Sequence, residues 1–206
     1  GGPLLDGGFE RLDTTVRTMS GSPDYSVDDT YTDLYDVNGD GLPDVVQTQA
    51  IPQLDWKHGL WLQGYQGKED RFGPRQPMGV EGVGGVTASS LSKSSPVVAA
   101  LDLDGNARID LLHMPEDSAY SVYTPKGAGQ NWNWAGRSIT TADGLDARID
   151  LTNDASLIRV MDVNGDGLVD VVKSGESYQV WYALGRYPGG DGLFGTATWL
   201  ANGPAL

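Results

Sequence analysis

The chain of 206 residues contains no cysteine and only two histidines, His58 and His113. Without cysteine it can form neither a disulfide bond nor a thiolate metal site. Neither histidine lies in a metal-binding spacing, and the sequence has no Gly-x-Ser-x-Gly elbow and no phosphate-binding loop. We therefore expect no enzymatic activity, with His113 packed behind a buried strand and His58 in a solvated turn.

Basic residues and long apolar runs are also scarce. The 14 Lys and Arg stand against 28 Asp and Glu, a formal net charge of −14 at pH 7, which disfavours nucleic acid as a partner. No apolar run approaches the roughly 20 residues of a membrane-spanning helix, and no signal peptide is visible. The chain starts at Gly1 without methionine, from which we expect an excised or processed piece. No long helical period appears, and 29 Gly and 11 Pro punctuate short apolar runs, which predicts an all-β fold.

What the sequence does contain is a nine-residue frame of alternating oxygen side chains, present three times. The third copy reads Asp162-Val163-Asn164-Gly165-Asp166-Gly167-Leu168-Val169-Asp170. Ca²⁺ takes six to eight oxygens at roughly 2.3–2.6 Å, and a chain supplies them locally by alternating acidic side chains with flexible glycines. The copies begin at Asp36, Asp102 and Asp162, and recurrence at a near-constant interval indicates a repeat architecture.

We predict that each frame binds one Ca²⁺ through positions one, three, five, seven and nine, the seventh through its backbone carbonyl. The predicted ligands are Asp36, Asn38, Asp40, Leu42 and Asp44 in the first frame, Asp102, Asp104, Asn106, Arg108 and Asp110 in the second, and Asp162, Asn164, Asp166, Leu168 and Asp170 in the third. The second frame has Ala107 where the others have glycine, and Arg108 adds a positive charge. We therefore predict weaker or absent calcium there. A partial echo ending at Asp150 lacks the earlier acids and is expected to be a strand with turn residues.

The residues around each frame distinguish this loop from an EF-hand. An EF-hand needs a bidentate Glu at its twelfth position, where this chain has Gln47, His113 and Lys173. Short apolar and β-branched runs lie on both sides of each frame, such as Val171-Val172 after the third. Such runs predict strands rather than helices, so we expect each ion to join the ends of two neighbouring antiparallel strands.

The run from Asp162 to Val172 resembles the core of the VCBS/FG-GAP repeat, which occurs in integrin α-chain propellers and in large bacterial surface and toxin proteins. Similar repeats occur in the B components of bacterial insecticidal toxin complexes. The resemblance covers most of the chain as three units. It implies a β-propeller of four-stranded antiparallel blades, each with a calcium loop between its first two strands. Because propellers usually have about four to eight blades, we expect an arc of a larger propeller.

The repeat spacing divides the chain into blades. We assign an outer strand of a preceding blade to residues 1–20, blade one to 21–95, blade two to 96–150 and blade three to 151–206. Within blade one we expect the fourth strand at residues 71–74 and a flexible Gly/Ser/Val-rich link at 79–95. Trp61 and Trp181 occupy matching positions and are expected in the core. Trp56, Trp132 and Trp134 are the candidates for an exposed aromatic patch.

Three functions remain open at this point. The one we favour is a non-enzymatic, calcium-stiffened scaffold or interaction module of a large secreted or surface protein, toxin-like or adhesin-like. Its partners would be other domains of the same polypeptide or another protein. The second is a carbohydrate-binding propeller with a glycan ligand, and the third is a non-catalytic part of a polysaccharide-processing enzyme. Calcium affinities of roughly 10⁻⁴–10⁻³ M suit extracellular modules, which favours a secreted or cell-surface location.

Overall fold

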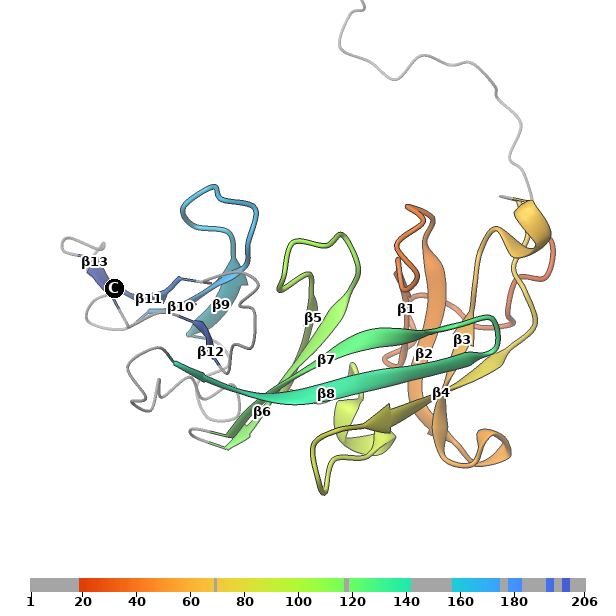
Figure 1. Ribbon diagram of the computed structural model, residues 1–206, viewed down its shortest axis with the longest axis horizontal. Helices are drawn as coiled ribbons and strands as arrows, with labels where there is room; N and C mark the ends of the chain where they lie inside the picture. The colour runs from red at the N-terminus through yellow and green to blue at the C-terminus, as the bar shows by residue number, and fades with distance from the viewer. Residues whose placement is uncertain are drawn as a thin grey trace, which may run out of the picture.

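The computed structural model describes residues 19–68, 70–116, 119–141, 157–174, 178–182, 192–194 and 198–200. The described residues form thirteen strands and three short 3₁₀ helices, η1 (Pro52–Leu54), η2 (Tyr65–Gly67) and η3 (Ala88–Leu91). The protein is therefore all-β, as the sequence predicts (Figure 1). Within these ranges, no helix has both the length and the apolar character needed to cross a membrane.

The strands form three antiparallel meanders of four. Unit one contains β1 (Thr32–Tyr35), β2 (Asp44–Ile51), β3 (Lys57–Trp61) and β4 (Gln76–Glu81). Unit two contains β5 (Val98–Leu101), β6 (Asp110–Glu116), β7 (Ala119–Ala128) and β8 (Asn131–Thr141). Unit three contains β9 (Ile158–Met161), β10 (Asp170–Lys173), β11 (Tyr178–Trp181) and β13 (Thr198–Leu200), while β12 (Gly192–Phe194) pairs in parallel with β8.

Each nine-residue frame joins the first two strands of its unit, which confirms the predicted hairpins. The register is the same in all three. The residue before the frame pairs with the ninth residue, as Tyr35 with Asp44, Leu101 with Asp110 and Met161 with Asp170. A fixed pairing across the loop means that equivalent frame positions hold equivalent places in the three units.

Units one and two are not separate sheets. β4 pairs in parallel with β8, with Met78 opposite Trp132 and Val80 opposite Trp134. The result is one continuous curled sheet, crossed by the long strands β7 and β8 (Figure 1). The close approach requires a glycine, because a Cβ atom on Gly82, whose φ is +109°, would collide with the Gly136 carbonyl oxygen.

Two expectations about unit one were wrong. The fourth strand is β4 at Gln76–Glu81 and not residues 71–74, where Phe72 makes only an isolated bridge with Gln63. Residues 79–95 are also not a flexible link, because they contain the end of β4 and η3, with the side chain of Leu91 fully buried. The spacing of aromatic residues places Phe72 in the fourth strand, but the pairing partner of β3 lies further along the chain. The glycines of residues 79–95 permit close packing, since a Cβ atom on Gly79 or Gly82 would collide with Asn133 or Gly136. Of the predicted outer strand in residues 1–20, only Met19 and Ser20 are among the described residues, where Ser20 makes an isolated bridge with Arg71, and the echo at residues 147–150 lies outside them.

The hydrophobic core lies between the units. One cluster joins units one and two through Val37, Val46, Leu60, Met78, Leu91, Leu111, Tyr123, Trp132 and Trp134. A second joins units two and three through Leu101, Leu103, Leu112, Met114, Val122, Ile158, Val171 and Trp181. Trp61 and Trp181 are buried, at 6% and 4% exposure, and His113 is 5% exposed, so these three predictions are confirmed.

His58, Trp132 and Trp134 are buried, contrary to the sequence-based expectation of exposure. His58 and Trp134 are 0% exposed and Trp132 is 7% exposed, while Trp56 is exposed as expected. The His58 Nε2–H group donates to the Ala88 carbonyl oxygen at 2.7 Å, and His58 Nδ1 accepts from Trp134 Nε1 at 3.1 Å. Burial lowers the pKa of His58 to about 4, so this ring is neutral at pH 7. It joins β3, η3 and β8.

We predict that His58→Leu destabilises the fold by about 2–4 kcal/mol, because it leaves a buried N–H group and a buried carbonyl without partners at about 1–3 kcal/mol each. The measurement is urea unfolding at pH 7.5, followed by tryptophan fluorescence. Trp56→Leu at the neighbouring exposed site is the control and should change stability by less than about 0.5 kcal/mol. Equal stability of the two variants would contradict the inferred role of His58.

Candidate metal centre

The three acidic loops, loop one (residues 36–44), loop two (102–110) and loop three (162–170), lie along one edge of the molecule (Figure 1). In each loop the ninth-position aspartate is buried, with Asp44, Asp110 and Asp170 at 0%, 1% and 0% exposure. Its Oδ2 accepts the backbone N–H of the second position, with distances of 3.0, 3.1 and 3.0 Å in order. This bond across the loop closes each turn in the same way.

Loops one and three have nearly the same internal hydrogen bonds. Both oxygens of Asp36 accept backbone N–H groups, from Gly39 at 2.7 Å and Gly41 at 2.8 Å. Asp162 accepts from Gly165 at 2.7 Å and Gly167 at 2.9 Å. In loop three these N–H groups, that of Gly167 first, hold the pKa of Asp162 below its usual value.

An amide group ties the middle of these two loops together. Asn38 Nδ2 donates to Asp40 Oδ2 at 2.9 Å, and Asn164 Nδ2 donates to Asp166 Oδ2 at 2.9 Å. The other oxygen of each aspartate accepts a backbone N–H group, from Leu42 and Leu168. Loops one and three therefore satisfy much of their polar surface internally.

Loop two differs because its third position is Asp104 in place of asparagine. Asp102 still accepts backbone N–H groups, from Asn106 at 3.1 Å and Ala107 at 2.8 Å. An oxygen from each of Asp102, Asp104 and Asp110 lies within 4.8 Å of the other two. Ligands bound to one Ca²⁺ at roughly 2.3–2.6 Å can be up to about 5 Å apart, so this arrangement fits a shared ion.

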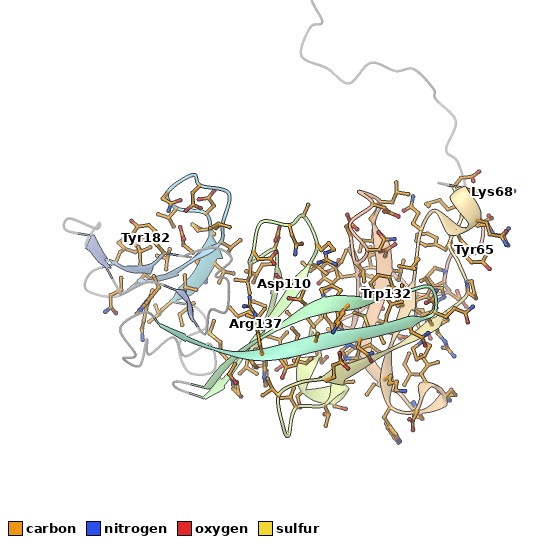
Figure 2. The ribbon with its side chains drawn as sticks, in the orientation of Figure 1. Tyr65, Lys68, Asp110, Trp132, Arg137 and Tyr182 are labelled. Atoms are coloured by element: carbon orange, nitrogen blue, oxygen red, sulfur yellow. The ribbon has the colours of Figure 1, made fainter. Side chains whose placement is uncertain are left out.

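Asp110 is the residue of loop two whose surroundings best fit a bound cation. Its Oδ2 accepts from Leu103, and its buried Oδ1 has no hydrogen-bond partner of good geometry among the described residues, although the Thr124 side chain lies close enough to lower the pKa of Asp110. Burial raises the pKa of Asp110 to about 6; the Thr124 side chain and the Leu103 N–H group oppose this rise, and the charges of Asp104 and Asp102 add to it. Asp110, labelled in Figure 2, begins β6 in the middle unit. Hard cations such as Ca²⁺ bind preferentially to clusters of carboxylate oxygens of this kind.

In loop one, Asp44 has both oxygens satisfied by backbone N–H groups, those of Val37 at 3.0 Å and Gln63 at 2.8 Å. Burial raises its pKa to about 7, despite these hydrogen bonds, and the Asp40 and Asp36 charges act in the same direction. Among the described residues, therefore, only loop two combines convergent carboxylates with an unpartnered buried oxygen.

The arrangement of the carboxylates does not follow the predicted order of calcium affinity among the three loops. The sequence predicts the weakest calcium binding in loop two, yet loop two brings its carboxylates together and loops one and three do not. Ala107 adopts the left-handed conformation of the glycine that it replaces, with φ 64°. The Arg108 side chain leaves its own loop, approaches Gly39 of loop one and places Nη1 3.5 Å from the Pro125 carbonyl oxygen. Calcium affinity itself stays a prediction for all three loops.

Sequence reasoning missed the contacts between neighbouring loops. The Ile109 N–H group donates to the Asp36 carbonyl oxygen at 3.1 Å, and Arg108 of the same loop lies against Gly39. The available signal was the glycine at position four, which all three frames share.

Comparisons with known proteins place the fold but not the function. No family model and no curated protein matches the chain. Among solved structures, it is similar to a chain of the Photorhabdus luminescens Tc holotoxin pore, with a TM-score of 0.53 and 14% sequence identity over 87% of this chain. The chain spans 7% of that chain's length. At this identity the likeness concerns the fold, here that of a small part of a large toxin chain.

We predict that Ala107→Gly stabilises the protein by about 0.5–1 kcal/mol. A left-handed conformation costs an L-residue roughly 1–2 kcal/mol, which glycine does not incur. The greater entropy of glycine in the unfolded chain reduces this gain by about 0.4–1 kcal/mol. Gly41→Ala makes the reverse change at the same position of loop one, where φ is +82° and no side chain is close. It should destabilise by a similar amount. Urea unfolding of both variants in the same buffer provides the measurement, and a shift of the same sign in both would contradict the assigned strain.

The raised pKa values of Asp44 and Asp110 predict a pH dependence in metal-free protein. Both carboxyls bind a proton more tightly in the folded chain, with pKa values of about 7 and about 6, than in the unfolded chain, where the pKa is about 3.9. The stabilisation is therefore fully present below pH 4 and is lost as pH rises through 6 to 7. His58, with its lowered pKa, contributes the opposite trend, so a variant is needed to separate them.

We expect Asp44→Asn to remove the Asp44 contribution. In urea unfolding with a chelator, the variant should lose less stability between pH 5 and pH 8 than the unmodified chain. Asp55→Asn is the control, because the Asp55 side chain is 88% exposed. Parallel stability–pH curves for Asp44→Asn and the unmodified chain would contradict the prediction.

Proposed function

We propose that the chain is a calcium-stabilised repeat scaffold within a large extracellular protein and that it has no catalytic role. The observation that carries this proposal is the buried, unpartnered Oδ1 of Asp110 beside Asp102 and Asp104. Ca²⁺ would be held there by these carboxylates together with Asn106 and the Arg108 carbonyl group, as the frame predicts. Loops one and three would bind Ca²⁺ after the side-chain amides of Asn38 and Asn164 rotate away from Asp40 and Asp166, which frees these carboxylate oxygens for the ion.

The bound ion would act on stability rather than on a substrate. A ligand that binds only the folded state stabilises it by RT ln(1 + [L]/Kd), about 2.7 kcal/mol at a hundredfold excess over Kd. In loop two the ion would offset the mutual repulsion of the carboxylates that converge there. Because the loops connect the first two strands of every unit, this would hold the unit edges in place.

The repeat geometry supports three propeller-type blades. Each unit is a four-stranded antiparallel meander with an acidic loop between its first two strands, which is the arrangement that the VCBS/FG-GAP resemblance implies. The parallel pairing of β4 with β8 is an addition to that pattern. The similar chain belongs to a Tc holotoxin pore, which supports a scaffold role in a large toxin-like protein whose other domains are the partners.

The carbohydrate-binding alternative has lost its main support. It required an exposed aromatic patch, and Trp132 and Trp134 are buried at 7% and 0% exposure. Trp56 alone of the three candidates is exposed, at 66%. A single exposed ring offers one stacking surface, so we do not pursue this function.

Calcium titration of the metal-free protein tests the proposal. Calcium at a hundredfold excess over Kd should raise the melting temperature by roughly 5–11 °C, since 1 kcal/mol is worth about 2–4 °C at this chain length. Asp104→Asn gives loop two the third-position asparagine of loops one and three, and we expect it to weaken calcium binding by loop two at least tenfold in calorimetry. Asp55→Asn should change neither value. No calcium-dependent shift at millimolar concentration would overturn the proposal.

A further inference from the structure

Neighbouring units contact each other through the same two frame positions. A Cβ atom built on Gly39 of loop one would lie 3.2 Å from Cδ of Arg108, the seventh residue of loop two. A Cβ atom built on Gly105 of loop two would lie 3.2 Å from Cδ2 of Leu168, the seventh residue of loop three. In both cases the fourth-position glycine of one unit receives the seventh-position side chain of the next unit.

The second frame position lies beneath this contact and is buried by it. Val37 is 0% exposed and Leu103 is 2% exposed. Val37 packs in one cluster with Leu111 and Tyr123 of the following unit, and Leu103 packs in one cluster with residues of unit three. The following unit therefore covers the inner edge of the loop before it.

Unit three presents the same surface uncovered. Val163, equivalent to Val37 and Leu103, is 39% exposed, and Met161, equivalent to the buried Leu101, is 49% exposed. A Cβ atom on Gly165 would meet no atom of the described residues within 4 Å. The strand register and the cross-loop bond are the same as in the other units, so among the described residues unit three differs in having no unit that covers this face.

We propose that the face formed by Met161, Val163 and Gly165 binds another unit of this repeat type, joined in the same polypeptide. The seventh-position side chain of that unit would rest on Gly165, and its first strands would cover Val163. The choice of occupant rests on continuity with the two interfaces inside the chain, which use the same positions. The acidic rim of loop three, with Asp162 and Asp166 exposed, disfavours an anionic lipid surface as the occupant.

This inference rests on the proposed scaffold role, because it concerns how the scaffold continues. Its test does not involve calcium, however. Protection of the face without any effect of calcium on stability would support this inference and contradict the proposed function. A calcium effect without protection of the face would support the proposed function and contradict this inference.

The test compares the chain with an extended chain that carries a second copy of residues 142–206 after Leu206. That copy supplies another unit three together with the segment that precedes it. Because the protein has no cysteine, a single Val163→Cys substitution in the original unit gives one thiol probe at an exposed site. We expect maleimide labelling of this probe to be about tenfold slower or more in the extended chain, since labelling would require the interface to open.

Three controls sharpen the result. Val37→Cys, at the equivalent buried position of unit one, should label slowly in both chains, and Asp28→Cys, at an exposed site, should label fast in both. Adding Gly165→Phe to the extended chain should block docking and restore fast labelling at position 163. Equal labelling rates of the Val163→Cys probe in the two chains would overturn the proposal. Concentration-dependent protection in the unextended chain would also overturn it, because the occupant would then be a second copy of this chain.

Discussion

The bond from the ninth-position aspartate to the second-position backbone is the interaction on which the rest of this structure depends. It recurs in all three loops at 3.0–3.1 Å, with the aspartate buried each time. A carboxylate that accepts a backbone N–H across the turn fixes both the loop and the direction of the second side chain. That side chain is Val37 in unit one and Leu103 in unit two, and each packs against the next unit. Loop closure and packing between units therefore have one origin.

Burial of the ninth-position carboxylate costs desolvation free energy, and the loops differ in the hydrogen bonds that offset this cost. Removal of a charged group from water is unfavourable unless hydrogen bonds or counter-charges compensate. In loop one two N–H groups reach Asp44, and an asparagine amide binds the neighbouring Asp40. Loop two has Asp104 where that asparagine would be, and one oxygen of Asp110 has no hydrogen-bond partner among the described residues. The loop in which a buried carboxylate oxygen has no hydrogen-bond partner of good geometry is also the one whose oxygens converge.

The local parts of this structure could be predicted from the sequence, and the non-local parts could not. The acidic frames and the apolar runs beside them predict the hairpins, because a turn and its two strands lie within a few residues. The pairing of β4 with β8 joins residues more than fifty positions apart and depends on close backbone approach at Gly82, which no short pattern reveals. The burial of His58 follows from its position in β3, because it shares a strand face with the buried Leu60, while the polar residues before it are typical of a turn.

The two kinds of glycine in the frame differ in how replaceable they are. At position six, Gly41 and Gly167 have positive φ, and a Cβ atom there would meet no other atom within 4 Å. A left-handed alanine can therefore take this position at a modest cost, as Ala107 does. At position four, Gly39 and Gly105 have positive φ and also receive a side chain of the next unit, so a larger residue would be strained and would also push that unit away. Arg108 satisfies the same contact as Leu168 because its aliphatic stem can cover an apolar surface while its guanidinium group reaches the Pro125 carbonyl. One nine-residue frame thus specifies both a turn and the seat for the following unit, which explains why position four is glycine in all three copies while positions six and seven vary.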